Sequence, residues 1–109
     1  NYRSIQCAAG TVRFIEAGSG SAVLFLHGAG VRASTYAPLI RPLARDFRVI
    51  APDLPGFGGS FTPPSSWTAE DFAACILDLA AKLGLDRFDV AAVKHLLDQC
   101  PHAGGHADE

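Results

Sequence analysis

Two short apolar segments, residues 22–26 and 47–51, constrain the fold of this chain more than any other feature. Each has the length of a strand and is bounded by turn-forming residues, a pattern typical of strands that are covered on both faces of a parallel sheet. Between them, residues 34–45 carry apolar side chains at helical spacing, namely Tyr36, Leu39, Ile40 and Leu43. Strand, helix and strand in this order predict a βαβ unit, and with it an α/β protein.

The residues before this unit predict a pair of strands. Residues 3–17 are divided by Ala9-Gly10, and the second half is rich in β-branched and aromatic residues. The run Gly18-Ser19-Gly20-Ser21 then predicts a turn before the first apolar segment.

A second helix is predicted by its end signals as well as by its apolar spacing. Thr68 precedes two acidic residues, as an N-cap does, and Gly84 follows the last apolar residue of the pattern. Lys82, in the last turn, complements the helix dipole. The apolar face consists of Phe72, Ile76, Leu79 and Leu83, with Cys75 expected in the core. Residues 88–92 follow as a third parallel strand.

Composition excludes several classes of protein. The chain has 109 residues, 49% of them hydrophobic and 18% charged, which is the balance of a globular domain rather than a disordered segment. Its net charge of -2 argues against nucleic-acid binding. No segment approaches a membrane span or a secretory leader, so we expect no membrane association and a cytoplasmic location. Three widely separated cysteines are compatible with reduced thiols.

A glycine-rich loop follows each of the first two buried strands. The first is His27-Gly28-Ala29-Gly30, whose small residues let backbone N–H groups face a ligand. The second runs from Asp53 to Ser60 and contains Pro55, Gly56, Gly58 and Gly59. Its glycines permit a compact turn with positive φ, and the side chains of Asp53 and Ser60 can hydrogen-bond the backbone of that turn. Either loop alone would be interpreted as an ordinary tight turn.

Together, and in this order, the two motifs resemble the H-G-x-G and D-x-P-G-x-G-x-S loops of serine-dependent α/β-hydrolases. The resemblance covers roughly residues 10–90 and implies the N-terminal part of that fold, a mostly parallel sheet with flanking helices that is incomplete at this length. It also implies that the N–H of Ala29 is one oxyanion-hole donor. The structural loop residues that it implies are His27, Gly28, Gly30, Asp53, Gly56, Gly58 and Ser60.

One position indicates which enzymes of this fold the chain resembles more. Epoxide hydrolases and haloalkane dehalogenases use an aspartate nucleophile on the same fold and usually carry proline two residues after the H-G pair. This chain has Gly30 there. The loop therefore looks more like that of serine esterases, lipases and carbon-carbon bond hydrolases.

The family's nucleophile is not identified in this chain. In serine hydrolases a G-x-S-x-G turn follows the next strand, whereas residues 88–92 continue here into Val93-Lys94-His95, and no serine follows Ser66. The acid and the base of a catalytic triad are not identified either. We therefore expect an N-terminal portion of a hydrolase of small esters or related carbonyl compounds. It should need no metal or organic cofactor, and as this chain it should be inactive.

Residues 93–109 are expected to lie outside the family likeness, which leaves residues 1–92 as a partial hydrolase domain. The tail would form a short helix and then a disordered segment. Two other interpretations stay open for it. Its His95, Cys100, His102 and His106 are donor types suited to zinc, although their spacing matches no familiar module, and Cys100 beside His102 is a weak candidate nucleophile.

A third interpretation belongs to another class of function. A truncated parallel sheet leaves unpaired N–H and C=O groups along its last strand, and such edges recruit other strands. The chain would then be a non-catalytic α/β module that pairs with another polypeptide or with itself.

Overall fold

The computed structural model describes residues 2–28 and 30–92. Ala29 and the tail from Val93 onward lie outside the described residues. The helix, the zinc site and the nucleophile that were predicted in the tail therefore lie outside them as well. Within those residues, no helix is both long and apolar enough to cross a lipid bilayer.

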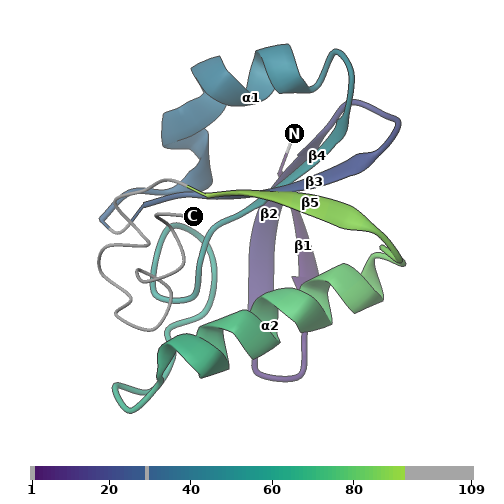
Figure 1. The fold of residues 1–109 in the computed structure, drawn as a ribbon. Helices are drawn as coiled ribbons and strands as arrows, with labels where there is room; N and C mark the ends of the chain where they lie inside the picture. The colour runs from purple at the N-terminus through teal and green to yellow at the C-terminus, as the bar shows by residue number, and fades with distance from the viewer. Residues whose placement is uncertain (1, 29, 93–109) are drawn as a thin grey trace, which may run out of the picture.

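Five strands form one sheet in the order β1-β2-β4-β3-β5 (Figure 1). The strands are β1 (Tyr2–Gln6), β2 (Thr11–Ala17), β3 (Ala22–Leu26), β4 (Arg48–Pro52) and β5 (Phe88–Ala92). The helices are the 3₁₀ turn η1 (Ala33–Tyr36), α1 (Ala37–Leu43) and α2 (Ala69–Lys82).

The sheet is mixed. β3 lies parallel to both β4 and β5, which confirms the predicted βαβ unit and the third parallel strand. β1 and β2 form an antiparallel hairpin, and β2 also pairs antiparallel with β4. The predicted α/β class is therefore confirmed, with the N-terminal hairpin as its antiparallel part.

The two helices cover opposite faces of the sheet, α1 on one side and α2 on the other (Figure 1). This arrangement explains why the central strands are apolar at successive positions, because side chains alternate between the faces of a strand. Val49 packs with Phe25 and Ile40 on the α1 side, whereas Ile50 packs with Leu79 on the α2 side.

The second helix begins and ends where its sequence signals predict. Thr68 is the N-cap residue, and its backbone N–H donates a hydrogen bond of 2.8 Å to the Asp71 carboxylate. Gly84, just after the helix, has a φ of 72°. Cys75 and Leu79 are buried against the sheet, as the apolar spacing predicted.

The first helix differs from its prediction. Residues 34–45 do not form one helix, since the segment divides into η1 and the seven-residue α1. Pro42 lies inside α1, which ends at the next residue. Leu39, predicted on the buried face, is 56% exposed. Ile40 is the buried residue of α1, and because consecutive residues of an α-helix lie about 100° apart, Leu39 falls at the margin of the buried face.

Candidate functional site

The two glycine-rich loops lie at the same edge of the sheet. One loop leaves the carboxyl end of β3 and the other leaves the carboxyl end of β4, and these strands are parallel neighbours. Ligand sites of open α/β sheets lie outside the carboxyl ends of their strands. This edge is therefore the candidate site.

His27 joins the two loops. Its imidazole is fully buried, and its Nε2 accepts a hydrogen bond of 2.8 Å from the N–H of Leu54, in the second loop. Since a backbone N–H can only donate, Nε2 is unprotonated, and Nδ1 carries the proton that bonds the Gly28 carbonyl at 2.7 Å. Burial lowers the pKa of His27, against smaller opposing effects of the Gly28 carbonyl and the Asp53 charge. His27 is thus a neutral group with both ring nitrogens bonded to the backbone.

Asp53 is also fully buried, and its carboxylate binds two separate segments. Oδ1 accepts a hydrogen bond of 2.8 Å from the N–H of Ala33, where η1 begins after the first loop. Oδ2 accepts one of 2.9 Å from the N–H of Gly59, at the end of the second loop. One carboxylate therefore holds both loops.

The Ser60 hydroxyl attaches the second loop to β2. It donates a hydrogen bond of 2.6 Å to the carbonyl of Asp53 and accepts one of 2.9 Å from the N–H of Arg13. The hydroxyl is thus engaged by backbone groups on both sides. That geometry suits a residue that holds a loop rather than one that attacks a substrate.

Three glycines of the site, Gly30, Gly56 and Gly58, have a positive φ that is unsuited to residues with side chains. Gly58 has a φ of 55°, and a Cβ placed there would lie 2.2 Å from Oδ2 of Asp53, so the loop closes tightly around that carboxylate. Gly30 has a φ of 84°, with no atom within 4 Å of a Cβ placed there. Proline, whose φ is fixed near −65°, cannot adopt the backbone of Gly30.

The other predicted site residues are Gly28, Gly56 and Ala29. Gly28 is buried directly after His27, and Gly56, with a φ of 91°, lies in the second loop. Ala29 lies outside the described residues, so its oxyanion role stays a prediction. No group of three His, Cys, Asp or Glu side chains in the described part of the chain could hold a metal ion.

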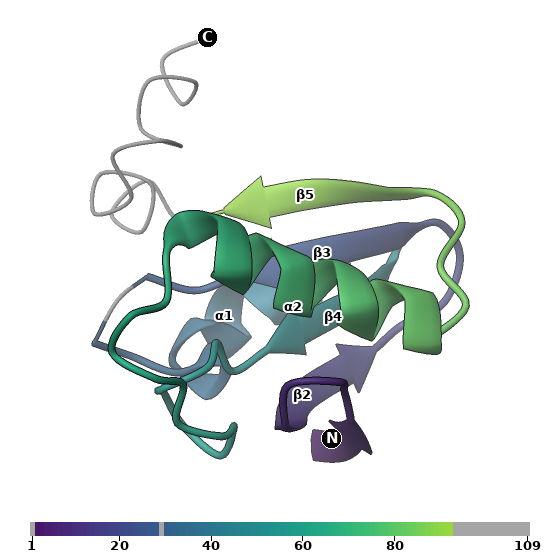
Figure 2. The ribbon, with the colours of Figure 1, turned by 90° about the horizontal axis from the view of Figure 1, so that it is seen from below.

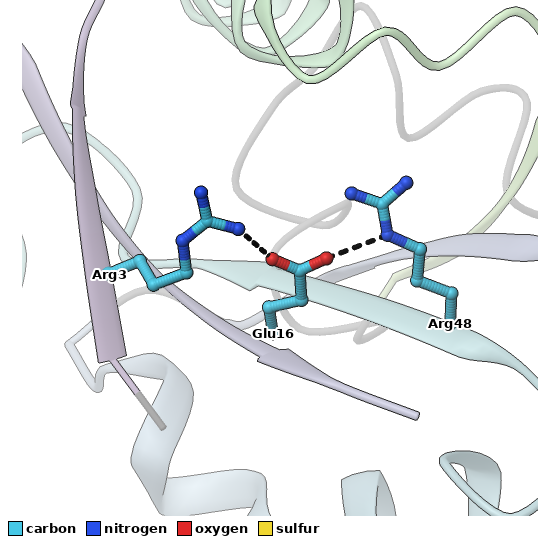
Figure 3. Close-up of polar contacts among 3 residues, drawn as sticks. All are labelled: Arg3, Glu16 and Arg48. Atoms are coloured by element: carbon cyan, nitrogen blue, oxygen red, sulfur yellow. Dashed lines mark hydrogen bonds and ion pairs between the residues drawn. The ribbon is translucent and has the colours of Figure 1, made fainter. Parts of the chain in front are cut away.

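One polar cluster was not predicted from the sequence. Glu16 on β2 bonds Arg3 on β1 and Arg48 on β4, the latter at 2.7 Å between Oε2 and Nε (Figure 3). Burial raises the pKa of Glu16, but its bonds to Arg48 and Arg3 outweigh this, and the net pKa is lowered. Since Arg48 begins β4, the cluster lies at the end of the sheet away from the loops, and it stabilises strand pairing there.

A cavity of 520 Å³ also lies away from the loops. Its lining includes Ser21 and Ala22 at the start of β3, and Arg87, Phe88 and Asp89 at the start of β5. The amino ends of these two parallel strands form the edge opposite the candidate site. This cavity therefore adds nothing to the site.

Comparisons with known proteins agree with this geometry. A family model described as "Alpha/beta hydrolase family" matches residues 23–106. The chain is 40% identical over 84 residues to an uncharacterised protein of Mycobacterium tuberculosis, an alignment that covers 77% of this chain and 24% of that protein. It is 43% identical over 75 residues to Epoxide hydrolase 1 of Siraitia grosvenorii, covering 66% of this chain and 24% of that enzyme.

A solved structure of similar fold is that of a membrane phospholipase A described as a bacterial virulence factor. Its TM-score is 0.81 at 28% identity, and the alignment covers 91% of this chain and 34% of that one. The chain thus spans about a third or less of the length of these relatives. The family match extends beyond Ala92, and the domain boundary at residue 92 stays a prediction.

Proposed function

Because this chain belongs to the alpha/beta hydrolase family, we propose that it forms the N-terminal part of a serine-type hydrolase of esters or related carbonyl compounds. The observation that supports the proposal is the pair of loops joined by His27 and Asp53 at the carboxyl edge of the sheet. These bonds fix the backbone on both sides of Ala29. Fixed backbone N–H groups are what an oxyanion hole requires.

In this proposal the chain contributes positioning rather than bond-breaking chemistry. A serine nucleophile would attack the carbonyl, a histidine would transfer its proton, and the Ala29 N–H would stabilise the oxyanion. His27, Asp53 and Ser60 already bond backbone groups, so we assign none of them to the triad. The 109-residue chain alone should therefore have no hydrolase activity. Its cytoplasmic location also stays a prediction.

The expectation that this chain alone is inactive can be tested by measuring whether the purified chain hydrolyses a p-nitrophenyl ester. We expect a rate equal to that of the buffer blank. Turnover that a serine-directed inhibitor abolishes would overturn it, because the nucleophile would then lie within these residues.

Epoxide hydrolysis is the second candidate, favoured by the 43% identity to Epoxide hydrolase 1 of Siraitia grosvenorii. Gly30 argues against it, since its backbone conformation excludes the proline that those enzymes usually carry. The coding DNA after the codon of Phe88, translated in all three frames, separates the two. A G-x-S-x-G sequence would support the serine hydrolase, and an aspartate at the position of that serine would support the epoxide hydrolase.

A third candidate function is binding through β5, the outermost strand on one side of the sheet. In the described sheet, β5 pairs on one side only, with β3 (Figure 2). Val90, on this strand, is 57% exposed. We propose that the edge pairs with β5 of a second copy, and expect a concentration-dependent dimer by sedimentation that Val90→Lys abolishes. A monomer at all concentrations would exclude this candidate.

A further inference from the structure

Two buried cysteines have no part in the proposed function. Cys7 is 3% exposed and Cys75 is 5% exposed, and both are free thiols. They are far apart in the sequence, yet they belong to the same apolar cluster on the α2 side of the sheet. The sequence alone gave no reason to pair them.

The turn between β1 and β2 is held against α2, the helix that carries Cys75. Cys7 begins this turn, and its N–H donates a hydrogen bond of 2.9 Å to the carbonyl of Gly10. The next N–H, that of Ala8, donates one of 2.8 Å to the carboxylate of Asp78 on α2. Asp78 lies three residues after Cys75 and therefore on the same side of the helix. The turn is thus attached to α2 one helical turn from Cys75.

A cavity gives access to one of the two thiols. It has a volume of 190 Å³ and lies between the β1–β2 turn and α2, where its lining includes Ala8, Trp67, Cys75 and Asp78. The lining is mostly apolar. Cys7 does not line it, so a small molecule from solvent reaches Cys75 first.

We propose that hydrogen peroxide converts Cys7 and Cys75 into an intramolecular disulfide, with Cys75 as the thiol that reacts first. The Sγ of Cys75, as thiolate, attacks one peroxide oxygen; an S–O bond forms, the O–O bond breaks, and hydroxide leaves and takes up a proton as water. The Sγ of Cys7 then attacks the sulfenic sulfur, the S–S bond forms, and a second hydroxide leaves as water. Two thiols lose two hydrogens in total, and one peroxide becomes two waters.

The reaction should be slow at neutral pH and accelerate in alkali. Burial, with the nearby Cys7 and Asp78 adding to it, raises the pKa of Cys75 to about 11. Because only the thiolate attacks, the rate should rise about tenfold per pH unit between roughly pH 7 and pH 10. This slope distinguishes Cys75 from an exposed thiol, whose rate levels off near its ordinary pKa.

The test uses the full chain with Cys100→Ser, which leaves Cys7 and Cys75 as its only thiols. The reduced protein is treated with hydrogen peroxide, quenched by acid, and digested without reductant for mass spectrometry. We expect the intact monomer to lose the mass of two hydrogens, and the peptides of Cys7 and Cys75 to appear linked. In urea Cys75 regains its ordinary pKa, so oxidation there should lack the steep pH dependence expected of the folded chain.

Two further variants in this background test the order of the steps. With Cys7→Ala, Cys75 should stop at the sulfenic acid and be trapped by dimedone. With Cys75→Ala, Cys7 should remain a thiol over the same time. Circular dichroism shows whether each variant is folded, and the Cys100→Ser result stands without them. Oxidation of Cys75 to sulfenic or sulfinic acid with no linkage to Cys7, or linkage only in urea, would overturn the proposal.

Discussion

At the scale of single residues, His27 and Asp53 are the sensitive points of the candidate site. Both side chains are fully buried, and each accepts a hydrogen bond from a backbone N–H outside its own loop. A buried polar group that loses its partner costs more than the bond itself contributes. Changes at these two residues should therefore be far more damaging than equivalent changes at the surface.

Asp53→Asn should destabilise the chain by ~2 kcal/mol. The amide can still accept one hydrogen bond through its oxygen, but its NH₂ group would face the N–H of either Gly59 or Ala33. Urea unfolding followed by circular dichroism measures the loss. Asp89→Asn, at an exposed position of β5, is the matched control and should change the free energy of unfolding by less than about 0.5 kcal/mol. Equal losses for both variants would show that the Asp53 bonds are unimportant.

His27 should make the stability of the chain depend on pH. The pKa of His27 is lowered in the folded state, so between its unfolded pKa of about 6.5 and its lower folded pKa only the unfolded chain takes up the proton. The contribution is complete above about pH 6.5 and is lost as the pH falls through this window. Urea midpoints from pH 8 to pH 5 should decline more steeply for the natural chain than for His27→Gln. Parallel curves would contradict the buried neutral imidazole.

At the scale of elements, the loop after β4 depends on a glycine that no other residue replaces. Gly58→Ala combines a φ of 55° with a contact of 2.2 Å between the new Cβ and Oδ2 of Asp53. We expect a loss of ~3 kcal/mol from strain and displacement of the carboxylate. Gly30→Ala meets only the backbone strain, because the space around it is open, and should cost ~1 kcal/mol. Thermal unfolding of the two variants compares them, and a greater loss for Gly30→Ala would contradict this account.

The elements themselves were largely predictable from the sequence. Apolar runs bounded by turn residues predicted β3 and β4, and Thr68 and Gly84 predicted the ends of α2. The exposure of Leu39 was not predictable by spacing alone, since Leu39 and Ile40 are adjacent apolar residues of α1 and only Ile40 is buried. Apolar spacing thus predicts that a helix or strand is present better than it predicts the burial of each of its residues.

The candidate site was predictable only in part. The residue types showed that Asp53 and Ser60 could bond the backbone of their own loop, and both do so, Asp53 at the Gly59 N–H and Ser60 at the Asp53 carbonyl. Their other partners, Ala33 and Arg13, come from distant segments, and the Arg3–Glu16–Arg48 cluster joins three strands. Such contacts depend on strand order and register, which are properties of the assembled sheet.

At the scale of the whole molecule, the described residues form a sheet with helices on both faces and two connected loops at its carboxyl edge. Relatives are about three to four times as long as the part that matches, since this chain covers 24% of Epoxide hydrolase 1 and 34% of the phospholipase A chain. We propose that the two loops position Ala29 as an oxyanion donor and that the chain holds no nucleophile.

Covalent labelling by a fluorophosphonate probe tests that claim most directly, because the probe reacts with activated serines and leaves ordinary serines unmodified. The purified chain is incubated with the probe and its intact mass is measured, with a serine esterase as positive control and a heat-denatured sample as negative control. We expect an unchanged mass for this chain while the esterase is labelled. An adduct on Ser60, or on any other serine of the native chain, would contradict it.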